Sequence, residues 1–529
     1  MHLNNEQDKL IFRPKLCLMK KLILMQGMKW MGWMCISLFL FSCSVSRKDF
    51  NPHAKYPVKE LQEDFTLFRN VLEESHPSLY WFTPKDSIDR YFDEAYAKLT
   101  DSMHERDFRT LLSYVASKFR CGHTSVRYSR EYSNYLDTAR LKIFPLSIKM
   151  WSDTMVVLAN LNRRDSILHR GVVVKSINGY SGTALRDTFF NFISGDGYAI
   201  NGKYQSLSNR GNFGTLYRNV FGLPDSLDIV YVDTLEQERA VTIPVFDPLL
   251  DTTGRGGAFR TGDISRRDIR SRGLNITRNI QIDTSLKSAY MTVSTFSRGN
   301  KLRGFFRRSF RIMKEHGIRH LAIDVRSNGG GDAGNSTLLT QYLINHRFRI
   351  ADSLYAVRRS SKYASNIRLQ RVYWFMMQFV TKKHDDGKYH FGYFERHYFK
   401  PKNKNHFNGN IYIITGGNSF SATTLFAQAM KGQSNVLIVG EETGGGAYGN
   451  TAWMIPDVTL PHTHIQFRLP KFRLVMNSSL VKEGRGVQPD IEVLPEIESL
   501  RQGVDMKVEV VRELIFRINE GWRKKNTVP

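Results

Sequence analysis

The sequence predicts an α/β protein in which a helical region and a β-rich region precede a larger α/β domain. After residue 286, apolar runs of strand length alternate with helical segments. Between residues 139 and 248 the apolar runs are short and β-like, whereas before them apolar residues recur at helical spacing. The chain of 529 residues is also longer than one hydrophobic core usually serves. We therefore expect two or three domains, the last with helices packed on a mostly parallel sheet.

Residues 1–42 have the features of a secretory signal. Lys20 and Lys21 precede an apolar run from Trp30 to Phe41, and Cys43 follows a small residue. A cysteine directly after such a cleavage point resembles the lipobox of bacterial lipoproteins, which implies a lipid on Cys43. The mature chain would then be held by a tether at the cell envelope of a Gram-negative-type bacterium, with its lipid in the membrane.

Two alternatives to this N-terminus stay open. A membrane-spanning anchor would need roughly 20 clean apolar residues, and Gln26 and Lys29 interrupt the run. Met19 is an alternative start, because the residues before it are polar or mixed and unlike a signal.

The cysteine count and the net charge limit which disulfides and partners the mature chain can have. Cys17 and Cys35 lie in the signal and Cys43 would carry lipid, so Cys121 alone remains and no intramolecular disulfide is expected. Residues 1–42 hold six Lys/Arg and two Asp/Glu, which leaves +22 of the net charge of +26. Such a surface favours anionic neighbours such as membrane headgroups or acidic peptides. We expect no nucleic-acid partner for an exported protein, and the oligomeric state stays open.

The predicted organisation follows these patterns in order. After the tether at 43–56, residues 57–138 form a helical domain, in which the helix before Cys121 ends at Gly122. Residues 139–248 form a β-rich domain, where the run from Gly171 to Gly179 resembles a turn of PDZ domains, although an ordinary β-turn would also fit. We then expect an Arg/Gly-rich linker at 249–285, an α/β domain at 286–497 and a C-terminal helix within 498–529.

Ser421 is the candidate nucleophile. It stands where the strand Asn410–Thr415 turns through glycine into a helix beginning at Ala422, so free N–H groups and the positive end of the helix dipole face its oxygen. Capping of the helix is the alternative role for this serine. A second glycine turn, at Gly329 and Gly330, ends the strand before it. Amides of Gly329 or Gly330 and of Ala422 could together form an oxyanion hole.

Four motifs follow one another in the second half of the chain: Asp324–Gly331, Ser419–Thr423, Gly440–Gly445 and Glu483–Asp490. In this order they resemble the motifs of the tail-specific, or C-terminal-processing, serine peptidases. With the helical and PDZ-like parts, the resemblance covers roughly residues 57–495. It implies a crotonase-like ββα catalytic domain, endoproteolysis of a protein or peptide substrate, Ser421 as nucleophile and no cofactor.

The general base is the point at which the sequence departs from part of this family. Members with a Ser–Lys dyad carry lysine where this chain has Gly446. The branch that resembles the tricorn core protease uses histidine oriented by glutamate, which implies His123 as base and Glu483 as its partner. That branch has serine before the histidine, where this chain has Gly122, so Thr124 could supply the missing hydroxyl.

Other roles for the candidate site residues, and two other functions for the protein, also fit the sequence. His76 is a fallback base with a structural role as its alternative, and Glu483 could be a solvated loop carboxylate. His462 and His464, on an expected strand, could begin a metal site, although no third ligand accompanies them, and we expect no metal. The rival functions are a catalytically silent peptide- or lipophile-binding lipoprotein on the same scaffold, and a PDZ-centred scaffold for envelope partners.

Overall fold

The computed structural model describes residues 50–250 and 273–526. The expected signal, Cys43, the first half of the tether and most of the linker lie outside these ranges. The described residues from Pro52 onward form one compact unit. Within the described ranges, no helix combines the length and the apolar character needed to cross a bilayer.

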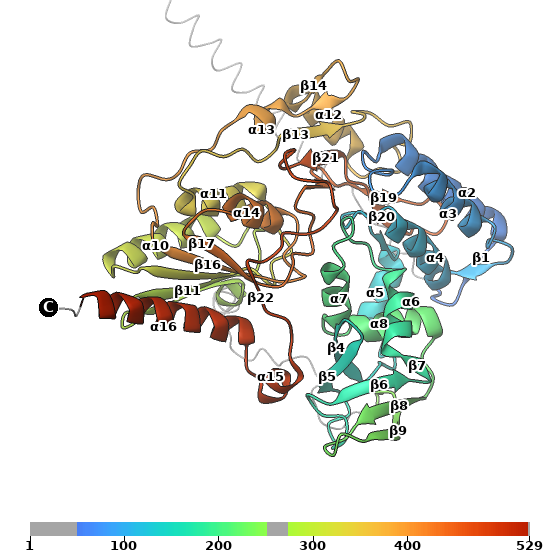
Figure 1. The fold of residues 1–529 in the computed structure, drawn as a ribbon. Coiled ribbons are helices and arrows are strands. Elements are labelled where there is room, and N and C mark those ends of the chain that lie inside the picture. The colour runs from blue at the N-terminus through green and yellow to red at the C-terminus, as the bar shows by residue number, and fades with distance from the viewer. Residues whose placement is uncertain (1–49, 251–272, 527–529) are drawn as a thin grey trace, which may run out of the picture. The chain divides into compact units, whose positions relative to one another are not determined.

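A six-stranded sheet forms the centre of the C-terminal half, as the sequence predicts (Figure 1). All neighbouring strands are parallel except for the first pair, β10 and β11. In order across the sheet these are β10 (Arg278–Asp283), β11 (Ser288–Val293), β12 (His320–Asp324), β16 (Asn410–Thr415), β17 (Val436–Gly440) and β22 (Ile491–Glu492).

Helices cover both faces of this sheet, which is why its strands are apolar nearly throughout. Leu321 and Ile323 of β12 join the larger core with Phe426, whereas Ala322 joins a second core on the other face with Val511. The first face is covered by α10 (Leu302–Glu315), α11 (Ala333–Leu343) and α14 (Ala422–Met430), and the second by α16 (Met506–Asn526), which follows the short α15 (Ile497–Gln502).

The expected linker at 249–285 is corrected at its C-terminal end. Strand β10 pairs with all of β11 through six residue pairs, from Arg278 with Val293 to Asp283 with Ser288. Alternating Asn279, Gln281 and Asp283 face solvent, so the strand looked polar in the sequence. The catalytic sheet therefore starts within the predicted linker.

The helical N-terminal region shares its core with the C-terminal half. Phe68 packs edge to face against Phe467, with ring centroids 4.9 Å apart, and residues 458–469 complete the same core. Strand β3 (Val126–Arg127) pairs antiparallel with β20 (Gln466–Arg468), which also pairs with β19 (Asp457–Thr459). The predicted helical domain therefore has no core of its own, because residues of the predicted α/β domain complete it. The other elements are β1 (Lys55–Tyr56), α2 (Val58–Ser75), α3 (Lys85–Tyr96), β2 (Met103–His104), α4 (Glu105–Lys118) and α5 (Arg130–Thr138).

The β-rich region has its own core and an antiparallel sheet. Asn178 and Gly179 both have positive φ, +47° and +79°, and join β6 to β7 in a two-residue hairpin. The run that resembled a PDZ turn is thus a tight hairpin. The strands are β4 (Leu146–Trp151), β5 (Thr154–Asn160), β6 (Val173–Ile177), β7 (Tyr180–Ser181), β8 (Ser226–Val232) and β9 (Glu238–Pro244), with helices α6 (Gly182–Phe190), α7 (Asn201–Ser208) and α8 (Asn212–Phe221).

A further sheet is inserted between the strands of the central one. Its helix α12 (Gln370–Val380) contributes buried Met377 to a small core with Leu354 and Phe472. The strands, in order across the sheet, are β14 (Lys382–Lys383), β15 (Tyr389–His390), β13 (Ser353–Ala356), β21 (Phe472–Val475) and β18 (Gly449–Ala452), beside helix α13 (Gly392–Arg396).

Candidate active site

Ser421 lies in a strained turn between β16 and α14. Its φ and ψ are +57° and −119°, so a non-glycine residue occupies the left-handed half of conformational space. Its side chain makes no capping hydrogen bond to the helix that follows. The hydroxyl is therefore not used as a helix cap, which was the alternative reading of this serine.

The turn of Ser421 is fastened to the glycine turn that follows β12. Phe420 donates its amide to the Asn328 carbonyl at 3.1 Å, and the buried Ser419 hydroxyl donates to the Val325 carbonyl at 2.9 Å. Because β12 and β16 are parallel neighbours, their carboxyl ends meet at one edge of the sheet. The serine is thus fixed from both strands.

Gly330 permits this close approach. Its φ is +99°, and a Cβ at this position would lie 2.8 Å from both the Phe420 carbonyl oxygen and the Ser421 Cβ. Real Cβ atoms essentially never come so close to other heavy atoms. Glycine is therefore required here by both conformation and space.

The structure distinguishes the two expected glycine donors. The Gly330 amide donates to the Asn328 Oδ1 at 2.9 Å and is not available for a substrate. Within the described residues, neither the Gly329 amide nor the Ala422 amide has a protein acceptor, and Ala422 is the first residue of α14. The free N–H pair is therefore Gly329 and Ala422, with Gly330 in a steric role.

His123 reaches Ser421 from the N-terminal region. Its Nε2 lies 3.1 Å from the Ser421 Oγ. The pairing of β3 with β20 fixes the chain just after His123, and the Arg468 amide adds a 3.0 Å hydrogen bond to the Ser125 carbonyl. The imidazole also packs on Phe420, with ring centroids 4.7 Å apart. Two positions far apart in the sequence thus form a hydrogen-bonded pair.

The His123 imidazole is buried and incompletely partnered. Burial, and secondarily the charge of Arg468, lower the pKa of His123 to about 3. The ring is thus neutral at physiological pH, as a proton acceptor must be. Its Nδ1 is buried and has no hydrogen-bond partner among the described residues.

The Glu483 carboxylate does not contact the His123 Nδ1. Its side chain is exposed, and no hydrogen bond in the described structure joins it to His123. The loop around it is held on its C-terminal side, where Glu442 accepts from Arg485 at 2.9 Å and from the Gly486 amide at 2.6 Å. The predicted contact between Glu483 and the imidazole is absent from this conformation.

Asp196 is a site residue that sequence reasoning missed. Its buried carboxyl accepts from the Gly122 amide at 2.7 Å and from the Gly446 amide at 3.4 Å. Burial raises the pKa of Asp196 to about 7, against the effect of these two donors. The carboxyl thereby joins the turn preceding His123 to the turn at Gly446. Only its place between glycines, in Ser194-Gly195-Asp196-Gly197, set it apart in the sequence.

Thr124 and His76 form a pair of their own. The His76 Nε2 lies 2.9 Å from the Thr124 Oγ1, which also donates to the Cys121 Sγ at 3.3 Å. The Thr124 hydroxyl therefore supports His76 and not His123, contrary to one expectation. Burial, together with the charge of Arg473, lowers the pKa of His76 to about 3. His76 makes no contact with Ser421 and has a structural place instead.

Gly122 and Gly446 stand where proteins with similar motifs carry a serine and a lysine, and the structure shows why neither side chain fits here. A Cβ at Gly122 would lie 2.6 Å from the Phe420 Cζ, so the phenyl ring fills the space of a serine side chain. A Cβ at Gly446 would lie 2.7 Å from the Gly449 carbonyl oxygen. A lysine at Gly446 would therefore need a different turn.

The pair His462 and His464 does not lie on a strand. Both residues are in the turn between β19 and β20, where the His462 Nε2 contacts Glu63 at 2.7 Å and His464 has a positive φ of +55°. Among the residues described, no three His, Cys, Asp or Glu side chains gather as metal ligands would. The strand expected at these histidines was wrong.

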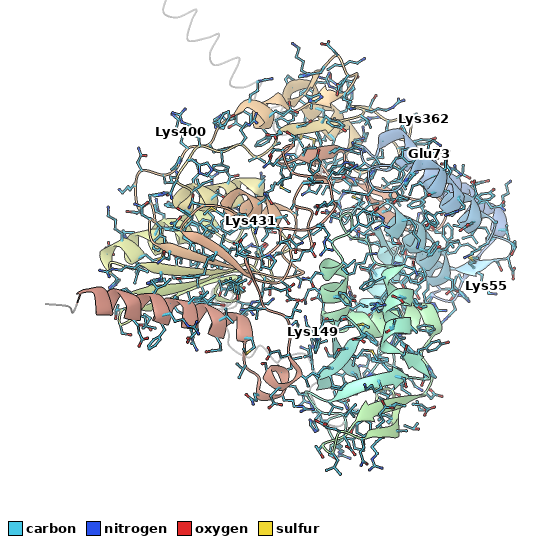
Figure 2. The ribbon with its side chains drawn as sticks, in the orientation of Figure 1. Lys55, Glu73, Lys149, Lys362, Lys400 and Lys431 are labelled. Atoms are coloured by element: carbon cyan, nitrogen blue, oxygen red, sulfur yellow. The ribbon has the colours of Figure 1, made fainter. Side chains whose placement is uncertain are left out.

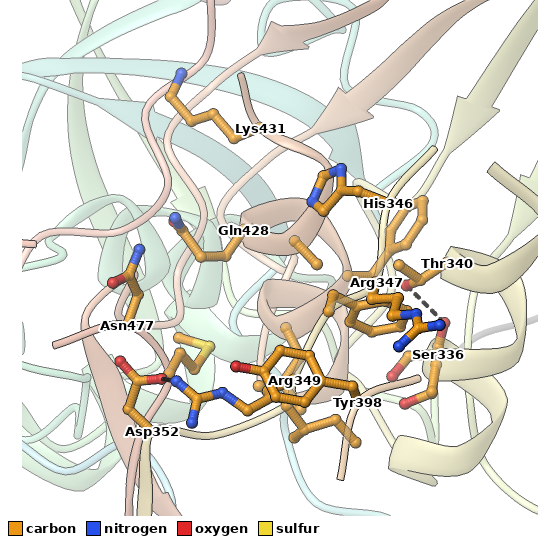
Figure 3. Close-up of a pocket in the computed structure, with 17 residues that line it drawn as sticks. Ser336, Thr340, His346, Arg347, Arg349, Asp352, Tyr398, Gln428, Lys431 and Asn477 are labelled. Atoms are coloured by element: carbon orange, nitrogen blue, oxygen red, sulfur yellow. Dashed lines mark hydrogen bonds and ion pairs between the residues drawn. The ribbon is translucent and has the colours of Figure 1, made fainter. Parts of the chain in front are cut away.

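A separate cavity of about 420 Å³ lies beside α11 and α14 (Figure 3). Neither Ser421 nor His123 lines it. Two of its cations are already paired, since Arg349 donates to Asp352 at 2.7 Å and Lys431 donates to Asp490 at 2.8 Å. The Ser421 turn and this cavity are therefore separate features of the structure.

Comparison with known proteins agrees with the geometry. Residues 287–493 match peptidase family S41, whereas no curated protein sequence matches the chain. The crystal structure of mature CPAF has a TM-score of 0.59 at 13% identity, covering 89% of this chain and 99% of that one. Mature CPAF complexed with lactacystin gives a TM-score of 0.57 at 14% identity, covering 88% and 98%. The photosystem II D1 C-terminal processing protease gives 0.40 at 13% identity, covering 84% and 96%.

The likeness to CPAF establishes a shared fold over nearly the whole chain. The fold and the matched domain define a serine-type peptidase. Residues 287–493 therefore form a domain of the peptidase family S41 type.

Proposed function

We propose that this peptidase is an endopeptidase of the cell envelope in which Ser421 attacks the peptide carbonyl and His123 is the general base. The observation that supports this most directly is the 3.1 Å contact between the His123 Nε2 and the Ser421 Oγ. The strained turn at Ser421 adds to it, because a hydroxyl held away from capping is presented to a substrate.

The proposed reaction uses only side chains and amides of this chain. His123 takes the hydroxyl proton while the Ser421 Oγ bonds to the carbonyl carbon, and the resulting oxyanion accepts from the Gly329 and Ala422 amides. The imidazolium then gives its proton to the leaving amine as the peptide bond breaks. Water attacks the acyl-enzyme by the same route, which releases the acid product and restores Ser421. No cofactor takes part.

Two carboxyl groups are proposed to position His123. Asp196 fixes the backbone of the preceding residue through Gly122. Glu483 would orient the imidazole through Nδ1 after a shift of its exposed loop, and such bonds are often unformed without substrate. The unpartnered Nδ1 is also the observation that favours the second candidate, a silent peptide- or lipophile-binding protein on this scaffold.

Labelling with a fluorescent fluorophosphonate tests the catalytic proposal without knowledge of the substrate. We expect the wild-type chain to be labelled on Ser421, and Ser421→Ala and His123→Gln to lose labelling while they remain folded. Ser327→Ala is the matched control, because Ser327 is an exposed hydroxyl in the adjacent turn. A folded wild type that resists labelling would favour the silent binding protein.

The lipid anchor is a separate proposal that depends on Cys43 following the expected signal. Growth with an alkyne fatty acid should label the wild-type chain in a bacterial host, and Cys43→Ser should abolish the label. An unlabelled wild type would overturn the lipoprotein assignment and leave the peptidase assignment untouched.

A further inference from the structure

Helix α12 presents an apolar stripe to solvent, the reverse of what a helix on a globular domain normally does. Its buried side consists of Gln370 and Met377. The opposite face carries apolar residues at helical spacing that are 43% to 75% exposed, with Phe379 the most exposed. These residues, called the α12 stripe below, are Leu369, Val372, Phe375, Met376 and Phe379.

The α12 stripe is ordered as one surface. The rings of Phe375 and Phe379 pack edge to face with centroids 4.9 Å apart. The helix is anchored beneath, where Arg359 donates to the Thr381 Oγ1 and to Gln378, both at 2.9 Å. A fixed helix with several large apolar groups in water marks an interaction site rather than scattered surface residues.

Basic residues flank the stripe in the sequence, and we call them its basic rim. Residues 357–400 contain ten Lys/Arg and three Asp/Glu, a net charge of +7. Lys362 and Lys400, near the two ends of this segment, are exposed (Figure 2). Exposed Arg371 lies on α12 itself, and exposed Lys382 and Lys383 follow it directly. The carboxylates of Asp386 and Glu395 each hydrogen-bond to His390, so part of their hydrogen-bonding capacity is already used.

A basic cavity continues from the end of the stripe. It has a volume of about 710 Å³, and Phe379, Lys382, Arg396 and His397 are among the residues that line it. Apolar groups beside cationic groups match a lipid surface, in which acyl chains lie under anionic headgroups. Aromatic residues at such a position are typical of the membrane interface.

We propose that the α12 stripe and its basic rim dock on an anionic lipid bilayer. The aromatic side chains enter the headgroup region while the flanking lysines and arginines contact lipid phosphates. This contact is independent of the proposed lipid on Cys43 and of the reaction at Ser421. It would orient the folded peptidase on the membrane rather than merely tether it.

Flotation with vesicles tests the proposal on the full-length chain. Vesicles of phosphatidylcholine with phosphatidylglycerol should bind the wild type, and Phe375→Ser/Phe379→Ser should weaken binding about tenfold or more. Lys382→Ala/Lys383→Ala should weaken it about 30-fold on these vesicles and leave binding to pure phosphatidylcholine unchanged. Leu235→Ser is the control, because Leu235 is 71% exposed in another region.

Direct insertion can be measured with brominated lipids, which quench nearby tryptophan. The extra emission of Phe379→Trp over the wild type should be quenched, whereas that of Leu235→Trp should not. Equal quenching of both, or equal vesicle binding by the serine variant and the wild type, would overturn the proposal. So would a loss of dimer in the serine variant by sedimentation without lipid, since the stripe would then cover a second copy. Fluorophosphonate labelling of the same variants should be unchanged, which separates this result from the catalytic proposal.

Discussion

Replacing Gly330 with alanine should disable the nucleophile without touching any reacting atom. The added Cβ would meet the Phe420 carbonyl oxygen and the Ser421 Cβ at 2.8 Å and the Ala422 amide nitrogen at 3.0 Å. Ordinary van der Waals contact begins at 3.4 Å, so these groups must move by about half an ångström. All three belong to the turn that presents Ser421.

Two costs follow from this geometry. The φ of +99° adds strain of about 1–2 kcal/mol for any side chain, and the contacts add a similar amount. We therefore expect the free energy of unfolding to fall by about 2–4 kcal/mol. A displacement of this order at the reacting oxygen should lower the rate by up to about 10²-fold, because catalysis depends on placement to within an ångström.

Gly329→Ala is the matched control in the same turn. No heavy atom lies within 4 Å of its added Cβ, its φ is not positive, and its amide is retained. The fluorophosphonate labelling rate and urea unfolding of the two variants should be measured together. Labelling within about threefold of wild type in Gly330→Ala, or equal losses in both variants, would refute the argument that Gly330 packs against the nucleophile.

Two further predictions concern buried titratable groups. Asp196→Asn should lower the maximum labelling rate about tenfold or more and leave the apparent affinity for the phosphonate unchanged. The reason is that one of the two backbone N–H donors, of Gly122 or Gly446, would then face the NH₂ group of the new amide. A loss of affinity alone would contradict a positioning role for Asp196. The folded pKa of His76, about 3, is below its unfolded value of 6.5, so the unfolded state binds more protons between these values and stability falls as the pH falls through this window. Between pH 7 and pH 5 the wild type should therefore lose about 2 kcal/mol more than His76→Gln in urea unfolding, and equal losses would contradict neutral burial of His76.

The sequence predicted the parts of the site that depend on local backbone. The strand, glycine turn and helix around Ser421 follow from apolar runs broken by glycine, and the structure has them within a residue or two. The placement of His123 came from the family resemblance, because no local pattern indicates which of 15 histidines meets a serine.

Other features depend on tertiary contacts that a single sequence does not contain. Asp196 acts through amides of Gly122 and Gly446, and its partners are set by packing of the β-rich region. The choice of Gly329 over Gly330 as donor depends on one side-chain contact from Asn328. No element is predicted from the sequence for residues 370–380, and only the exposure of the side chains in the folded chain reveals the α12 stripe.

The proposed nucleophile Ser421 and its proposed base His123 are 298 residues apart, and the pairing of β3 with β20 holds the chain just after His123 in place. In the proposed mechanism, an early portion of the chain lacks the nucleophile, and a fragment limited to residues 286–497 lacks the proton acceptor. The proposed enzyme would thus stay latent until nearly its full length has been made and folded. If the chain is exported before it folds, as the proposed signal implies, this latency would protect the compartment in which it is synthesised.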